Sequence, residues 1–312
     1  MKQKKLNVLA ILLACTFLVT ACKKENDSAE KLSADAEIAT HYDDESMVSQ
    51  EIDAIASETN SLIEADPALS GNASVLDEVI CDASVVANFE SDPMSVTITF
   101  NGTDCGIKRT RTGVMVLTMA KGTLWKNAGA TIMVNFQNLK ITRKMDGKSI
   151  TLNGTKTYTN LSGGLVHQAA SAGTIIHTIA SGDLNIKFDD GTARVWNVAR
   201  KKVFTYDGGL VITVHGMHED GEIDGIAEWG TNRFGNSFST SIEQPLVVKQ
   251  ACDFRLTGGE ITHKTEVFSV TATFGLDASG TPTTCPGTGK YYYKLGWTRN
   301  TNGNTFTLLL PY

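Results

Sequence analysis

Residues 130–159, ATIMVNFQNLKITRKMDGKSITLNGTKTYT, decide the fold class of this chain. Apolar side chains occupy every second position from Ile132 to Phe136, the period of a strand with one buried face. The pair Asp146-Gly147 then supplies the positive-φ residues that a tight hairpin turn requires, and a second strand-like run follows it. The stretch therefore predicts a long antiparallel β-hairpin.

The same pattern recurs over most of the chain. Asp-Gly pairs at 190–191, 207–208 and 220–221 again lie between strand-like runs. These repeats predict an all-β fold, a large antiparallel meander that is either a sandwich or one strongly twisted sheet. The expected strands are 95–101, 112–119, 130–142, 149–159, 174–187, 193–206, 210–217, 222–231, 237–249, 264–274, 289–298 and 304–310.

The first 21 residues have the layout of a secretory signal peptide. Three lysines precede the apolar run 6–19, which is shorter than the roughly 20 residues needed to span a bilayer. The small residues leading into Cys22 resemble the lipobox of bacterial lipoproteins, in which the cysteine is acylated, for example with palmitate, and becomes the first mature residue. We expect Cys22 to carry the lipid anchor. Lys23, where an Asp would resemble an inner-membrane retention signal, favours the outer membrane.

A strongly acidic segment follows the expected tether 22–44. Residues 30–66 contain eleven acidic residues and one lysine, and apolar residues recur at helical spacing from Val48 to Ile63. The pattern predicts one amphipathic helix, 45–66, which either lies on the β domain or acts as a spacer. Its carboxylates are expected to form a solvated face.

The remainder, 67–312, forms the expected β domain. The whole chain has a net charge of -6 and a pI near 5.6. A chain with this net negative charge lacks the excess of Lys and Arg that binding to a phosphate backbone needs, so we expect no nucleic-acid partner.

Four cysteines remain for an oxidising compartment once Cys15 leaves with the signal and Cys22 is acylated. Three pairings are possible. Pairing Cys81 with Cys105 and Cys252 with Cys285 closes the shortest loops. It also matches an internal echo, in which a cysteine, an alternating strand and a second cysteine recur in the same order. The echo indicates either a duplicated module, at 81–160 and 252–312, or a chance likeness between strand-forming sequences.

Several short motifs carry a family resemblance. They are Arg109–Gly113 after Cys105, Gly154–Asn160, Gly230–Gly235, and Pro245–Val247 before Cys252. Together with the lipobox and the acidic segment, they are similar to a group of β-rich outer-membrane lipoproteins of Bacteroidetes-type bacteria. That group has no assigned activity, so the resemblance implies location and architecture only.

His215 and His218, with acidic neighbours up to Asp224, form the one cluster of metal-ligand composition. On a strand, positions 215 and 218 point to opposite faces. We therefore expect a charged hairpin tip and regard the two histidines only as weak metal candidates. The sequence contains neither a Gly-x-Ser-x-Gly elbow nor a His-Glu-x-x-His motif, and we expect no catalytic residue and no cofactor.

These features favour a non-catalytic cell-envelope lipoprotein that acts as a binding or interaction module. The expected partners are the membrane, through the lipid anchor, and a glycan or an envelope protein. A fimbrial or adhesin-like structural subunit is the first alternative, and a metallohydrolase is the second. The sequence leaves open whether the β domain faces the periplasm or the cell surface.

Overall fold

The computed structural model describes residues 80–106, 108–285, 289–300 and 305–312, together with helical residues 40–41, 43–44, 47–48, 51, 54–55, 58–64 and 67–70. The signal segment 1–21 and Cys22 lie outside the described residues. Within the described residues, no helix is both long and apolar enough to cross a bilayer.

Two compact units divide the chain, Met1–Asp44 and Glu45–Tyr312. In the first unit, residues 40, 41, 43 and 44 are helical, so helical structure begins within the segment expected to be a tether. The second unit contains both the expected helix and the expected β domain.

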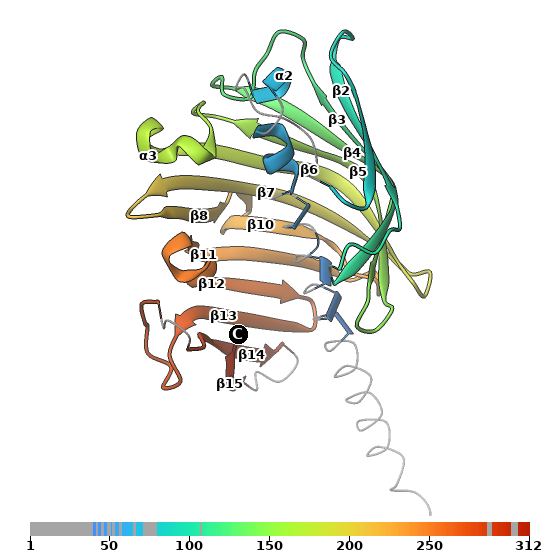
Figure 1. The fold of residues 1–312 in the computed structure, drawn as a ribbon. Helices are drawn as coiled ribbons and strands as arrows, with labels where there is room; N and C mark the ends of the chain where they lie inside the picture. Colours follow the sequence, from blue (N-terminus) through green and yellow to red (C-terminus); the bar gives the residue numbers. More distant parts are fainter. Residues whose placement is uncertain are drawn as a thin grey trace, which may run out of the picture. The chain divides into compact units, whose positions relative to one another are not determined.

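A single antiparallel sheet, not a sandwich, makes up the second unit (Figure 1). The sheet order follows the chain except around β8 and β9. Its strands are β1 (Ala83–Asn88), β2 (Met94–Asn101), β3 (Arg109–Met119), β4 (Ala130–Arg143), β5 (Ser149–Asn160), β6 (Ile175–Phe188), β7 (Ala193–Tyr206), β8 (Leu210–Gly216), β9 (His218–Asp220), β10 (Ile223–Thr231), β11 (Ser237–Lys249), β12 (Arg255–Thr265), β13 (Phe268–Leu276), β14 (Tyr292–Arg299) and β15 (Thr305–Pro311). Short helices α2 (Pro67–Ser70), η1 (Val166–Gln168), α3 (Ala169–Ala172) and η2 (Gln250–Cys252) connect or flank them.

The sheet curves, and helical residues between 47 and 64 lie against its concave face (Figure 1). Val48, Ile55 and Leu62 share one buried cluster with the inward side chains of β2–β7. The apolar stripe of the acidic helix is thus the side that packs on the sheet, as amphipathic helices do.

β-Bulges keep the apolar side chains of each long strand turned towards the core while the sheet bends. In β4, buried positions alternate up to Phe136, skip to Leu139, and alternate again. Asn138 lies between them with a φ of 48°, and its N–H donates to Asn153 Oδ1 at 2.9 Å. On the other neighbouring strand, a Cβ at Gly113 would lie 2.2 Å from the Asn138 carbonyl oxygen, so this bulge needs glycine beside it.

β8 and β10 do not pair as the hairpin that the sequence predicts around Asp220-Gly221. β7 pairs with β10 over residues 195–198 and with β8 over residues 200–206, so the two strands lie end to end between β7 and β11. Between them, β9 folds back on β10 as a small hairpin. The Asp220-Gly221 turn closes this smaller hairpin.

The expectation of a solvated face for the helix carboxylates is wrong for three of them, Glu51, Glu58 and Glu64, of which the first two contact β3. Glu58 makes ion pairs with Arg109, at 2.6 Å, and with Arg111. Glu51 lies 3.2 Å from Arg109, and burial raises the pKa of Glu51 even though both arginines lower it. Glu51 and Glu58 are seven residues apart and therefore share one helix face. That face meets the two arginines, whose side chains hold the helix on β3.

The two disulfides have the local pairing favoured by the sequence. Cys81 bonds to Cys105 and Cys252 bonds to Cys285. Each bond brackets a two-stranded hairpin, β1–β2 in the first case and β12–β13 in the second. The feature that 81–160 and 252–312 share is therefore a hairpin closed by a disulfide, and both hairpins belong to one continuous sheet.

Candidate functional site

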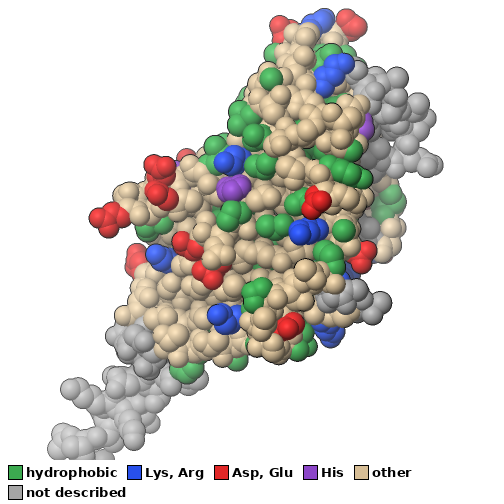
Figure 2. Space-filling model, turned by 90° about the vertical axis from the view of Figure 1, so that its left-hand side faces the viewer, with side chains coloured by type: hydrophobic (Ala, Val, Ile, Leu, Met, Phe, Trp, Pro, Cys, Tyr) green, Lys and Arg blue, Asp and Glu red, His purple; other side chains and the backbone are tan. Residues whose placement is uncertain are grey.

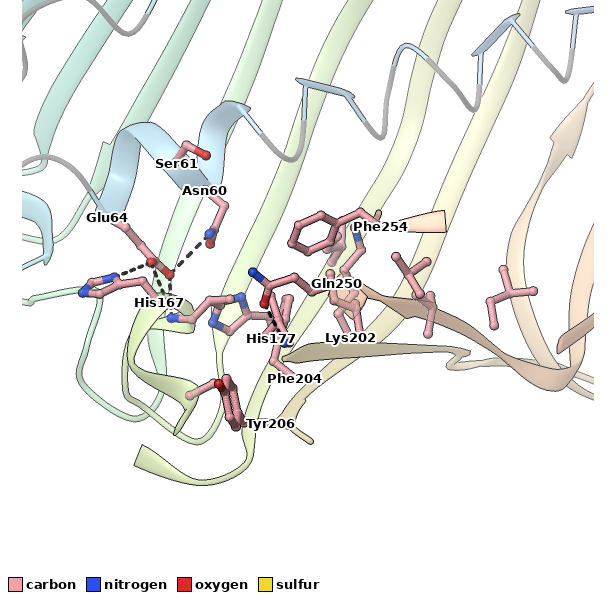
Figure 3. A pocket seen from close by; sticks show the side chains of 18 of the residues that line it. Asn60, Ser61, Glu64, His167, His177, Lys202, Phe204, Tyr206, Gln250 and Phe254 are labelled. Carbon is pink, nitrogen blue, oxygen red and sulfur yellow. Dashed lines mark hydrogen bonds and ion pairs between the residues drawn. The ribbon is translucent and has the colours of Figure 1, made fainter. Parts of the chain in front are cut away.

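A cavity of about 980 Å³ lies on the concave face of the sheet, beside the end of the helix (Figure 3). Strands β5–β8, β11 and β12 supply its wall, and helix residues 60, 61 and 64 border it together with η1 and α3. Its volume is at the upper end of the roughly 300–1,000 Å³ that small-molecule sites occupy.

An apolar ladder runs across one half of this wall. Phe204 of β7 lies opposite Ile212 of β8, Ile212 opposite Val248 of β11, and Val248 opposite Leu256 of β12. A shorter second row joins Val214 to Leu246. The six residues of the two rows all line the cavity. Phe204 is buried, and the other five are only half-buried. We call these six residues the apolar ladder.

The opposite end of the cavity is polar and is organised by Glu64. Its carboxylate accepts the backbone N–H of Val166 at 2.8 Å and lies 2.9 Å from the ring Nδ1 of His167. The side-chain amide of Asn60 donates to the same carboxylate at 3.3 Å. Figure 3 shows these contacts joining the helix to η1. Glu64 therefore fastens the helix end where it borders the cavity.

His177 lies in the wall between two aromatic rings. Its imidazole makes edge contacts with Trp125 and Phe204, at centroid distances of 5.0 and 4.9 Å. Its Nε2 is enclosed and has no hydrogen-bond partner among the residues that the structure describes. Burial lowers the pKa of His177 to about 4; Lys202 adds to this lowering and Glu64 opposes it. The imidazole is therefore neutral at pH 7.

Two cationic side chains of β7 complete the polar end. Lys202 lies opposite His177 in the β6–β7 pairing. Arg200, two residues earlier and therefore on the same face, makes an ion pair with the buried Glu228 of β10. Among the described lining residues, the charged side chains other than histidine are thus two cations and one carboxylate, Glu64.

The polar end brings one imidazole and one carboxylate into contact. His167 and Glu64 form an imidazole–carboxylate pair of the kind that orients a general base. Figure 3 shows the side chain of Ser61 pointing away from the His167 ring. The pair links η1 to the helix instead of activating that hydroxyl.

The structure gives the two weak metal candidates separate surroundings. His215 of β8 lies opposite Lys201, and partial burial together with Lys201 lowers its pKa. His218 of β9 stacks on Trp229 at a centroid distance of 3.8 Å. Among the described residues, no group of three or more His, Cys, Asp or Glu side chains is arranged to hold a metal ion.

Sequence reasoning missed the cavity residues. Lys202, Phe204 and Tyr206 alternate along β7, and Leu210, Ile212 and Val214 alternate along β8, so their common face was a detectable signal. On the side that Figure 2 shows, hydrophobic side chains are scattered among charged ones in small groups. The cavity is therefore a stronger candidate site than that surface.

Comparison with known proteins gave no match: no family model, no curated protein and no solved structure is similar to this chain.

Proposed function

We propose that this chain is a cell-envelope lipoprotein, anchored in the outer membrane through Cys22, whose β domain binds an apolar small molecule without chemical change. The signal layout and the lipobox-like residues before Cys22 support the anchor. The cavity supports the binding role. A small apolar ligand fits its wall better than a glycan, which would need more hydrogen-bonding groups than the apolar ladder offers.

The half-burial of the apolar ladder is the observation that carries the proposal. Side chains such as Ile212 and Val248 normally complete a core when they point to the concave face of a sheet. Here the described residues leave them only half-buried, and a cavity of about 980 Å³ lies beside them. A ligand that covered these side chains would gain about 25 cal/mol for each Å² of apolar surface removed from water.

The alternatives have weaker support. In a fimbrial subunit that donates a terminal strand, that strand would pair with a neighbouring molecule. Here the last strand, β15, pairs with β14 of its own chain over seven residues. A metallohydrolase would need three convergent ligands, and His215 and His218 have different neighbours.

A matched pair of variants tests the binding role. Val214→Trp places a large ring in the cavity, whereas Thr213→Trp places the same ring on the opposite face of β8. The full-length lipoprotein in lipid nanodiscs is titrated with the neutral probe 1-aminoanthracene, with empty nanodiscs as the blank. We expect wild type and Thr213→Trp to bind it, and Val214→Trp to lose at least tenfold in affinity. Equal binding by both variants, or recovery of a chemically altered probe, would refute the proposal.

The anchor is tested separately. Cys22→Ala should accumulate as an unprocessed precursor without acyl chains, because the modified cysteine is the lipid attachment point. Intact-protein mass spectrometry of membrane fractions measures this directly. An unlipidated mature wild-type chain that begins at another residue would exclude the lipoprotein assignment while leaving the cavity untouched.

A further inference from the structure

His177 brings an unsatisfied polar group into the wall of the cavity. The residue is only 5% exposed, it lines the cavity, and its Nε2 has no hydrogen-bond partner among the described residues. A buried nitrogen in this state has lost its hydrogen bond to water without gaining another. A ligand group that supplies the missing bond therefore gains more here than an apolar group would.

The imidazole can offer a nitrogen to the cavity from either of its long edges. Nδ1 lies on one edge and Nε2 on the other, and the χ2 torsion of histidine has two broad wells. A half-turn of the ring exchanges the two edges, so an enclosed nitrogen can be brought to the other side. Because a neutral imidazole carries one donor and one acceptor, a hydroxyl group, which can both donate and accept, matches either edge.

The charges around His177 are already balanced. Arg200 is ion-paired with Glu228. Glu64 raises the pKa of His177 and Lys202 lowers it, and Lys202 has an interaction of its own within the protein. Apart from histidine, two cations and two carboxylates thus gather at this end of the described cavity. A charged head group would add an uncompensated charge to a partly desolvated site, whereas a neutral head group would not.

We infer that the ligand is an uncharged single-chain amphiphile whose hydroxyl head hydrogen-bonds to the imidazole of His177, with its hydrocarbon chain along the apolar ladder. This inference rests on the proposed binding function and adds the chemical class. Phe204, the first residue of the ladder, lies 4.9 Å from the His177 ring, measured between centroids. The head position and the start of the chain path are therefore neighbours (Figure 3).

The register sets the chain length. From β7 to β12 the ladder crosses three strand spacings of about 4.8 Å, roughly 14 Å in all. An extended hydrocarbon chain advances about 1.25 Å per carbon, so roughly eleven carbons cover that distance. Along a series of primary alcohols, each methylene up to that length should tighten binding about fourfold, and further methylenes should add little.

Displacement of 1-aminoanthracene from the full-length lipoprotein in nanodiscs tests the head group. The competitors are dodecanol, 1-chlorododecane, dodecanoate and dodecylammonium, with concentrations corrected for partition into empty nanodiscs. We expect dodecanol to compete at least about fivefold better than 1-chlorododecane, which lacks the hydroxyl, and at least about tenfold better than either ion. A 1-monolauroylglycerol that competes better than dodecanol would identify the source as a glycerol monoester; the reverse would identify a simple alcohol.

A matched pair of histidine variants tests the contact itself. His177→Phe keeps a ring in the wall but removes its nitrogens. His215→Phe makes the same change next to Val214 on β8, where the side chain points to the opposite face of the sheet. Both variants should still bind 1-aminoanthracene. The preference for dodecanol over 1-chlorododecane should fall below about twofold in His177→Phe and stay unchanged in His215→Phe.

Photo-crosslinking tests the direction of the chain. The probe is a dodecanol that carries a diazirine at its last carbon, and peptide mass spectrometry locates the label. With the hydroxyl at His177, the label should fall on β11 and β12, near Val248 and Leu256. Val214→Trp should abolish it, and Thr213→Trp should retain it. A label on β6 and β7 instead would put the hydroxyl at the wrong end of the cavity.

The outcomes separate the two claims. If 1-aminoanthracene binding depends on Val214 but dodecanol competes no better than the ions, the ligand class is wrong and the binding function stands. An unchanged preference for dodecanol in His177→Phe would also overturn the inference. If His177→Phe does not fold, the ranking of the competitors and the position of the label in the wild-type protein decide it. Equal 1-aminoanthracene binding by Val214→Trp and Thr213→Trp would overturn both claims.

Discussion

At the scale of single residues, His177 makes the stability of the fold depend on pH. Its pKa is about 4 in the folded chain, against an ordinary value of 6.5, because it is buried and Lys202 is nearby. Between pH 6.5 and 4 the unfolded chain takes up a proton that the folded chain does not. The histidine's contribution to stability is therefore complete above pH 6.5 and is lost as the pH falls towards 4.

The expected loss is about 1.4 kcal/mol of unfolding free energy per pH unit across that window. Urea unfolding at a series of pH values measures it, and His177→Phe should flatten the dependence by that amount. His263, whose pKa burial also lowers to about 4, should keep a comparable slope in the variant. An unchanged slope in His177→Phe would show that His177 is not held neutral by the fold.

The ion pair between Asp82 and Arg111 is the second residue-scale determinant of stability. Asp82 Oδ1 and Oδ2 accept two hydrogen bonds from the guanidinium of Arg111, at 2.7 and 2.8 Å, and both side chains are buried. Removing one partner leaves a buried charge without its main counterion, which costs about 3–5 kcal/mol. Asp82→Ala should destabilise the protein by that amount in urea unfolding.

Glu90, paired with Lys121 on the surface at 3.6 Å, provides the control. Glu90→Ala should cost less than about 1 kcal/mol, because exposed ion pairs contribute little. Similar losses for the two variants would mean that the Arg111 cluster is solvated in solution.

At the scale of elements, the bulges set the curvature of the sheet, and one of them gives a sharp prediction. Gly113 has a φ of 110°, and a Cβ there would lie 2.2 Å from Asn138 O. Gly147 also has a positive φ, 74°, yet a Cβ there would meet nothing within 4 Å. Gly113→Ala should cost more than about 3 kcal/mol by thermal or urea unfolding, and Gly147→Ala only about 1 kcal/mol. Equal costs would contradict a close approach at the bulge.

Period-two alternation and the Asp-Gly turns predicted most strands, since both signals are local. β1 was not predicted because it is an edge strand whose residues are mostly exposed on both faces. β12 was not predicted because the pair Gly258-Gly259 resembles a turn. In the structure, Gly259 lies inside the strand, where a Cβ would approach Pro245 O to 2.6 Å across a register shift in β11. A glycine required by a neighbouring bulge has the same local signature as one required by a turn.

At the scale of the whole molecule, the alternation along β7 and β8 shows which residues share a face, but their assembly with β11 and β12 into one cavity could not be predicted because it depends on the order and register of distant strands. The ladder joins Phe204 to Leu256 through three strand pairings, and the small β9–β10 hairpin separates β8 from its partner β11 in sequence. The helix carboxylates were misjudged for the same reason. The arginine partners of Glu58 lie about fifty residues further along the chain, and only the folded sheet brings them to the helix.

The second unit is a curved sheet, and we propose that its concave cavity holds an apolar ligand. A crystal structure of the protein grown with 1-aminoanthracene is the sharpest test of this proposal. We expect density for the probe against Ile212, Val214 and Val248, within the cavity bordered by Glu64. Density for the probe only on the outer face or at the sheet edges, with ordered water filling the cavity, would contradict it.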